Sequence, residues 1–195
     1  GNQTADEDDR YGFVCESPTL PYTLFGSGIR FSKRDKSDNV AIDFFNDRSV
    51  AVVEKMVPLM RDKNTTLFAG DFGSKYSDPF EALFVPNFME NRELFFCNQL
   101  LLALDFRKME ADFGVLPIPK FDEDQEEYYS VMSTWWSDNL VVPATNQRLD
   151  MTGHILDAMG YYSQQLVTPA FIDTTVLGKA VRDDDSANMV RMIYD

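Results

Sequence analysis

The segment DRSVAVVEKMVPLMR, residues Asp47–Arg61, is the clearest helix in the sequence. Four apolar residues recur along it at the spacing of one helix face: Val50, Val53, Val57 and Met60. Asn46 or Asp47 can cap its amino end, because a short polar side chain accepts a hydrogen bond from a backbone N–H of the first turn. Pro58 is expected to kink or loosen the last turn.

Candidate strands and further helices alternate on both sides of this helix. Before it, the pattern predicts strands at 11–15, 29–32 and 40–44 and a helix at 18–25 that Gly26-Ser27-Gly28 ends. After it, we predict helices at 78–90, 100–109, 149–166, 169–177 and 186–194. Strands are predicted at 93–97, 112–118, 129–133 and 139–142. This alternation indicates an α/β fold in which helices flank mixed sheets.

The composition describes an ordinary folded domain with a strong acidic excess. The 195 residues are 44% hydrophobic and 13% aromatic, and 32 acidic residues against 18 basic ones give a net charge of −14. This charge argues against nucleic acid and against an anionic membrane surface as partners. The longest apolar run, at 100–104, is far shorter than the ~20 residues of a membrane span. Without a leader sequence, the protein is either cytosolic or secreted with its leader removed.

The two cysteines and the acidic start of the chain each leave two interpretations. Cys15 and Cys97 have apolar neighbours, and we favour buried thiols over a disulfide bridge. Residues 1–10 are predicted to be an acidic loop or tail. The alternative is the back half of a calcium loop. Since its leading ligands would precede Gly1, we expect no calcium at Asp6 and Asp9.

Signals for catalysis, metals and cofactors are weak, and we predict no enzyme, no cofactor and no metal. His154 is the single histidine, and the sequence has no GxSxG nucleophile motif. Gly26-Ser27-Gly28 is too short for a phosphate loop. The acidic runs at 122–127 and 183–185 are typical of solvated turns. A carbohydrate-active enzyme with a carboxylate pair remains the alternative, although no spacing specifies the required geometry.

Trp135-Trp136 is the most informative polar–aromatic cluster. Small polar residues surround the pair, from Ser133 before it to Asn139 after it. Sugar-binding sites combine a flat aromatic face with amide, acid and hydroxyl groups. Alternation along a strand would equally bury one ring and expose the other as packing. Both interpretations stay open on the residues alone.

Three stretches of the chain resemble the extracellular solute-binding proteins of family 1, which include the maltose-binding protein. One is residues 111–123, ADFGVLPIPKFDE, and another is residues 128–145, where the Trp pair leads into NLVVP. The third runs from VTPAFID at 167–173 to GKAVRD at 178–183. The likeness covers residues 11–195 and is nearest to lipoprotein members from Gram-positive bacteria.

The resemblance implies a two-lobed, class II periplasmic-binding-protein-like α/β fold that closes on its ligand. Residues 11–133 would belong mainly to the second lobe, and residues 134–195 would form the hinge crossover and the helical return to the first. The implied protein is a cell-surface lipoprotein that binds a small saccharide and passes it to ABC permease subunits. A non-transport binding module is a further alternative. The candidate ligand-binding residues are Trp135, Trp136, Asn98, Gln99 and Ser133.

The abrupt start and the end inside a helical pattern predict a truncated chain. On this expectation, the N-terminal half of the first lobe and the C-terminal helices lie outside these 195 residues. Half of the binding cleft would then be absent. We therefore expect this chain by itself to bind sugar weakly or not at all.

Overall fold

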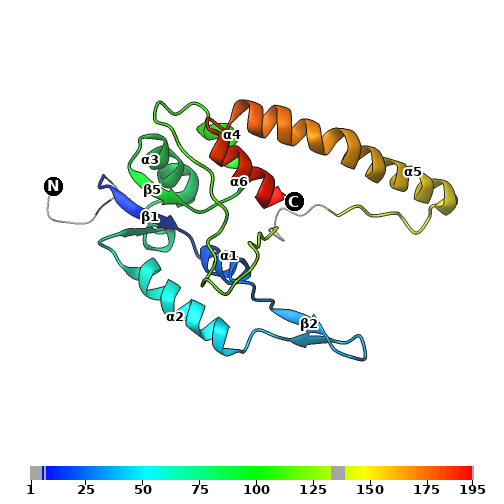
Figure 1. The fold of residues 1–195 in the computed structure, drawn as a ribbon, viewed down its shortest axis with the longest axis horizontal. Helices are drawn as coiled ribbons and strands as arrows, with labels where there is room; N and C mark the ends of the chain where they lie inside the picture. The colour runs from blue at the N-terminus through cyan, green and yellow to red at the C-terminus, as the bar shows by residue number, and fades with distance from the viewer. Residues whose placement is uncertain (1–5, 7, 133–138, 195) are drawn as a thin grey trace.

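Three short parallel strands form the central sheet of the computed structural model, which describes residues 6, 8–132 and 139–194 (Figure 1). The strands are β1 (Tyr11–Cys15), β4 (Thr66–Phe68) and β5 (Glu93–Phe96), in the order β4-β1-β5. β1 lies in the middle and pairs in parallel with both neighbours. Side chains of this sheet form the largest core cluster with the segment that follows β4: Tyr11, Val14, Leu67, Leu83 and Phe84.

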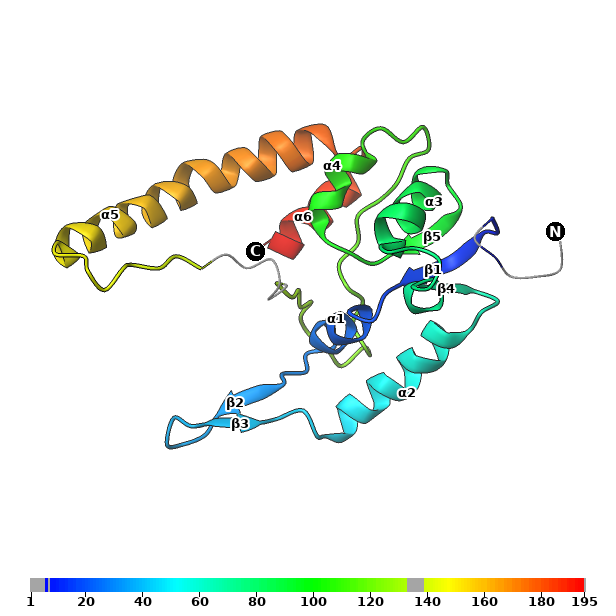
Figure 2. The same cartoon turned by 180° about the vertical axis from the view of Figure 1, so that it is seen from behind.

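Two crossovers connect the strands: the first joins β1 to β4 at one edge of the sheet, and the second joins β4 to β5 at the other edge. The first contains α1 (Thr19–Gly26), the antiparallel hairpin of β2 (Ser32–Arg34) and β3 (Val40–Ile42), and α2 (Asp47–Arg61). The second contains η1 (Ala69–Asp71), the π-helical turn η2 (Phe80–Phe84) and α3 (Val85–Met89). In Figures 1 and 2, α2 and α3 lie on opposite sides of the strands. The α/β prediction is thus confirmed, with one parallel sheet and a separate antiparallel hairpin in the described residues.

Helix α2 has the predicted bounds, but the face that it buries coincides only in part with the predicted one: Met60 is buried and Val53 half-buried, whereas Val50 and Val57 are exposed. Asn46 caps it, because its side chain accepts a hydrogen bond from the Ser49 backbone N–H at 2.9 Å. The helix continues through Pro58 to its last residue. Val52 is fully buried against α1, whereas Val50 is 54% exposed. The buried face is rotated relative to the predicted apolar face because α1 packs on the side of the helix that carries Ser49 and Val52.

The second half of the chain is mainly helical. It contains the 3₁₀ turn η3 (Leu100–Leu102) and α4 (Ala103–Phe106), then α5 (Leu149–Tyr162), η4 (Ser163–Val167), η5 (Ala170–Leu177) and α6 (Asp184–Tyr194). Helix α6 packs against η5 through Ile172, Val176 and Val190. Helix α5 instead extends away from the rest of the molecule (Figures 1 and 2), and none of its residues is buried.

The predicted strands at 112–118 and 139–142 are wrong, and the described part of 129–133, residues 129–132, is likewise irregular. Pro117 and Pro119 have no backbone N–H for a ladder bond, which disfavours a paired strand at 112–118. Hydrogen bonds to side chains, and not backbone pairing with another strand, hold this segment. The Val115 N–H donates to Ser186 Oγ at 3.0 Å, and Arg182 donates to three backbone carbonyls nearby.

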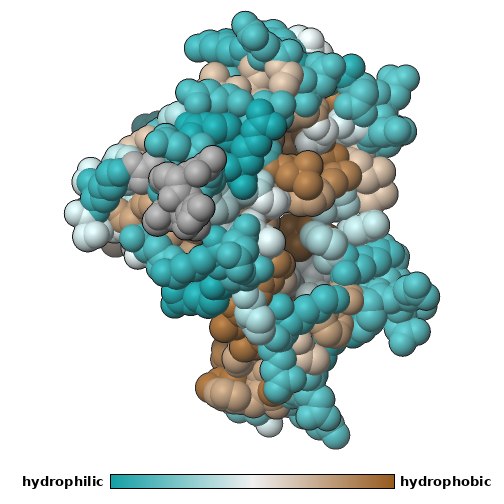
Figure 3. Space-filling model, turned by 90° about the vertical axis from the view of Figure 1, so that its left-hand side faces the viewer, coloured by the Kyte–Doolittle hydropathy of each residue, from teal (hydrophilic) through white to brown (hydrophobic). Residues whose placement is uncertain are grey.

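One strand was missed by the sequence pattern, and the hairpin strands are displaced. β4 has only three residues, too few for alternation to be recognised. The hairpin strands begin or end two to three residues away from the predicted 29–32 and 40–44. Several apolar side chains of this region are exposed, including Val40, Ile42 and Phe45. Figure 3 shows hydrophobic residues reaching the surface between hydrophilic areas on the face that it presents.

Candidate functional site

The carboxyl ends of β1 and β5 bring two distant polar side chains together. Glu16 follows β1 directly, and Asn98 lies two residues after β5. The Asn98 side-chain N–H donates to Glu16 Oε1 at 3.1 Å. In open α/β sheets, ligand crevices form outside the carboxyl ends of the strands where successive crossovers diverge. This pair lies outside the carboxyl ends of the neighbouring strands β1 and β5.

Local hydrogen bonds orient both members of the pair. The Glu16 backbone N–H donates to Thr19 Oγ1 at 3.1 Å, and Thr19 is buried at the start of α1. The Gln99 backbone N–H donates to Asn98 Oδ1 at 2.7 Å. The Asn98 amide is therefore held at both ends. It retains one N–H and one oxygen lone pair for a ligand, because an amide offers two donors and two acceptor positions.

Glu16 has an environment that favours its protonated form. Burial raises the pKa of this carboxyl above its ordinary value, and the negative charge of Asp78 raises it further. The hydrogen bond from Asn98 opposes both effects. A half-buried carboxyl of this kind can accept or donate a hydrogen bond to a hydroxyl group.

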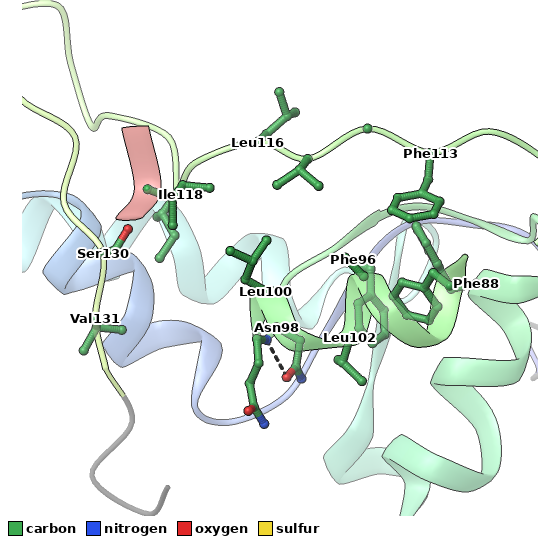
Figure 4. Close-up of a pocket in the computed structure, with 16 residues that line it drawn as sticks. Phe88, Phe96, Asn98, Leu100, Leu102, Phe113, Leu116, Ile118, Ser130 and Val131 are labelled. Carbon is green, nitrogen blue, oxygen red and sulfur yellow. Dashed lines mark hydrogen bonds between the residues drawn. The ribbon is translucent and has the colours of Figure 1, made fainter. Parts of the chain in front are cut away.

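A pocket of about 260 Å³ adjoins Asn98 and Gln99 (Figure 4). Four aromatic rings line it: Phe88, Phe96, Phe106 and Phe113. The rings pack on one another, with centroids 4.7 Å apart for Phe88 and Phe106 and 5.6 Å apart for Phe96 and Phe106. Residues of the irregular 112–118 segment and of the chain near Ser130 complete the lining.

The pocket combines an apolar wall with few polar groups. Asn98 and Gln99 provide amides, and Ser130 provides a hydroxyl. Ligand sites commonly have volumes of ~300–1,000 Å³, so this pocket accommodates a single ring or one part of a larger ligand. Such a wall suits the C–H face of a ring, while the amides suit its hydroxyl edge.

Of the five predicted site residues, the structure brings Asn98 and Gln99 to this crevice. Trp135, Trp136 and Ser133 lie outside the described residues. Ser130 and Val131, which precede them in the chain, line the pocket. Glu16 and the phenylalanine cluster were missed by the sequence analysis. The signal that points to Glu16 is its position directly after a predicted strand.

One carboxylate of each acidic run has a structural role. Asp122 forms an ion pair with Arg48 at 2.7 Å, and Arg48 also donates to the Ser27 carbonyl. Asp183 accepts a hydrogen bond from the Ser186 N–H at 2.7 Å and so caps the start of α6. These contacts account for the two carboxylates without a catalytic pair. His154 is exposed on α5.

A second buried carboxyl lies at the opposite end of β5. Glu93 is 6% exposed, and neither of its carboxyl oxygens has a hydrogen-bond partner in the described part of the chain. Burial raises its pKa to about 8, and the charge of Arg92 opposes this shift. Because Glu93 begins β5, it lies away from the carboxyl-end crevice and is not part of it.

Across residues 6, 8–132 and 139–194, no three histidine, cysteine or acidic side chains gather as metal ligands. None of the helices in that part of the chain is both long and apolar enough to cross a bilayer.

In comparisons with known proteins, no family model matched the chain, and no match was found among curated proteins or solved structures.

Proposed function

We propose that this chain binds a saccharide as part of an extracellular receptor that delivers the sugar to an ABC importer. The observation that carries the proposal is the Asn98–Glu16 hydrogen bond beside the aromatic-lined pocket, at the carboxyl ends of β1 and β5. The resemblance of residues 111–123 and 167–183 to the family 1 solute-binding proteins supports the same function. No chemical step is required of this site.

A neutral polyol ring suits the crevice better than an anion does. Asn98 and Glu16 together present donors and acceptors within one hydrogen-bonded unit. The net charge of −14 repels anionic ligands such as sugar phosphates. The pocket volume of about 260 Å³ suits one sugar ring, with further rings extending into the crevice.

Closure between two lobes is the second part of the proposal. Residues 11–133 would form most of one lobe, and residues 134–195 would return through a hinge to the other. Helix α5 fits this arrangement because its exposed apolar residues, such as Ile155 and Met159, gain stability only when another element packs on them. The receptor would be anchored at the cell surface as a lipoprotein and dock with permease subunits.

The test measures sugar binding by the full-length receptor. A panel of neutral mono- and oligosaccharides is screened by thermal shift, since a ligand that binds only the folded state raises the melting temperature. The best ligand is then titrated by calorimetry into the wild type and Asn98→Ala. We expect Asn98→Ala to weaken binding about tenfold or more, equivalent to ~1.4 kcal/mol. Its ligand-free stability should change by only ~1 kcal/mol.

The matched control is Asn188→Ala, which removes the same side chain from an exposed position on α6. This variant should bind like the wild type. Absence of binding by every sugar in the panel, or equal affinity of Asn98→Ala and Asn188→Ala, would contradict the proposal. Labelled oligosaccharides recovered after incubation should be intact. Their hydrolysis would instead support the alternative of an enzyme using Glu16 with the nearby Asp78.

A further inference from the structure

The two cysteines occupy corresponding positions at the ends of adjacent parallel strands. β1 pairs with β5 at Tyr11–Glu93, Phe13–Phe95 and Val14–Phe96, an offset of 82 residues each time. The same offset relates Cys15, the last residue of β1, to Cys97, the residue after β5. Corresponding side chains on neighbouring parallel strands point to the same face of the sheet. The two thiols therefore lie side by side.

This spacing is within reach of a disulfide bond. Neighbouring strands are ~4.8 Å apart, and disulfides join residues whose Cα atoms are ~4.4–6.8 Å apart. Cys97 lies just beyond the paired residues of β5, so the ladder does not hold its backbone. Cys97 is therefore the member of the pair whose backbone can move toward the other. The Cys97 side chain is close enough to raise the pKa of Cys15 beyond the effect of burial.

The two thiols differ in their access to solvent. Both are free, as the sequence predicted. Cys15 is only 1% exposed, whereas Cys97 is partly exposed, so the prediction of two buried thiols is correct only for Cys15. A soluble oxidant therefore reaches Cys97 first, and Cys15 is positioned behind it.

We propose that Cys15 and Cys97 form an oxidisable pair, which a small-molecule disulfide converts into an intramolecular bridge between β1 and β5. The Cys97 thiolate attacks one sulfur of the oxidant, forming a mixed disulfide and releasing one thiol of the oxidant. The Cys15 thiolate then attacks the Cys97 sulfur and releases the second thiol. The two protein thiols lose two electrons and two protons in total, and the oxidant gains both as two thiols.

The surroundings of the pair make this oxidation slow at neutral pH. Burial raises the pKa of Cys15 to about 12 and also raises the pKa of Cys97. The negative charge of Glu16 adds to the shift at both thiols. Since the thiolate is the attacking form, a raised pKa lowers the reactive fraction, and oxidation becomes faster as the pH rises.

The bridge would act directly on the crevice described above. Cys15 precedes Glu16, and Cys97 precedes Asn98. Joining the two sulfur atoms ties together the backbones that carry the Asn98–Glu16 hydrogen bond. The inference rests on the strand pairing and on the placement of the two thiols, so it stands whether or not the crevice binds a sugar.

The experiment treats the full-length protein with excess oxidised glutathione at mildly alkaline pH. Samples are denatured in iodoacetamide and analysed by mass spectrometry without reduction. We expect two alkylatable thiols to disappear per chain, the intact mass to fall by two hydrogens, and a peptide pair linking Cys15 to Cys97 to appear. The melting temperature should rise relative to the reduced protein, because the bridge restricts the unfolded chain.

The single variants Cys15→Ser and Cys97→Ser are the controls. In Cys15→Ser the remaining thiol should accumulate as a mixed disulfide with glutathione. In Cys97→Ser the buried Cys15 should react more slowly. Two thiols that stay alkylatable, two separate glutathione adducts, or a disulfide-linked dimer would each overturn the proposal. These outcomes leave the sugar-binding test unaffected, because that test monitors ligand affinity and not thiol content.

Discussion

Two polar residues near the ends of β5 differ in their hydrogen bonding. Asn98, near the carboxyl end, has partners on both sides of its amide and retains capacity for a ligand. Glu93, at the amino end, is buried without a hydrogen-bond partner in the described residues. Asn98 can still bind a ligand, whereas Glu93 is a titratable group in the core, where its charged form is disfavoured.

Glu93→Gln should change the pH dependence of stability. The folded-state pKa of about 8 lies above the ordinary value of 4.5, so the folded state binds more protons between these two values. The free energy of unfolding therefore falls as the pH rises from ~4.5 to ~8, by up to ~1.4 kcal/mol per pH unit. The neutral glutamine removes this pH-dependent loss. The free energy of unfolding of the variant should therefore exceed that of the wild type most clearly above pH ~8. Urea unfolding at several pH values measures the difference.

The control for this prediction is Glu81→Gln, which neutralises an exposed carboxylate. Its stability should follow the wild-type pH profile. A Glu93→Gln variant with the same pH profile as Glu81→Gln would show that Glu93 is charged and solvated in the folded protein.

Trp135 and Trp136 provide a second test at the residue scale. We predict that one of the two rings stacks on the sugar in the full-length receptor and that the other packs inward. Trp→Ala at the stacking position should weaken binding about tenfold or more while folding is retained. Trp→Ala at the packing position should lower stability by ~3–5 kcal/mol. Calorimetry and thermal melting of both single variants measure these effects. If neither folded variant loses affinity, the tryptophans have no ligand role.

At the scale of elements, side chains from the C-terminal helical region position a segment that forms no β-sheet hydrogen bonds. Residues 112–118 contain Pro117, are followed at once by Pro119 and pair with no strand in the described chain. Arg182 donates to the carbonyls of Arg107, Met109 and Ala111. Its guanidinium also lies 5.5 Å from the centre of the Phe113 ring, which lines the pocket. The pocket wall thus depends on a side chain from just before α6.

Arg182→Met should therefore destabilise the protein. The variant leaves three carbonyls without their charged donor and also breaks the ion pair with Asp112. Because the arginine side chain is 26% exposed, water replaces part of these interactions. We expect a loss of ~1–2 kcal/mol in the free energy of unfolding. Lys179→Met, which removes an exposed charge nearby in sequence, should have little effect. Equal urea midpoints for the two variants would contradict this role of Arg182.

For the whole molecule, net charge is the dominant electrostatic feature. A charge of −14 on 195 residues produces self-repulsion that is strongest in the compact state. Salt screens this repulsion over ~10 Å at 0.1 M. The few ion pairs that salt also weakens, such as Arg48–Asp122, are partly exposed and contribute less than ~1 kcal/mol each.

We therefore expect the melting temperature to rise when sodium chloride is increased from low to moderate concentration. Neutralising two exposed carboxylates with Glu123→Gln and Asp124→Asn should raise stability at low salt and reduce the salt dependence. Thermal melting of both proteins at matched pH measures the effect. A melting temperature that falls steadily with added salt would mean that attractive ion pairs outweigh the repulsion.

Local sequence patterns were sufficient to predict many of the regular elements of this protein. The bounds of β1 and α2, the helical character of 149–177 and the α/β class follow from short-range spacing and capping residues, which act within a few positions of each other. The same patterns failed at 112–118 and 139–142. A β-like composition there has no partner strand to pair with in the described residues, and Pro117 interrupts the first of the two segments.

The sequence by itself determined the class of fold, the acidic surface and the position of Asn98 after a predicted strand. Only the tertiary structure decided which face α2 buries, and that Arg182 holds the pocket wall. It also decided that Glu16 meets Asn98 and that Cys15 lies beside Cys97. The physical reason is that strand pairing joins residues 82 positions apart. Such a register depends on crossover geometry and on packing of the whole core, which no local window of sequence contains.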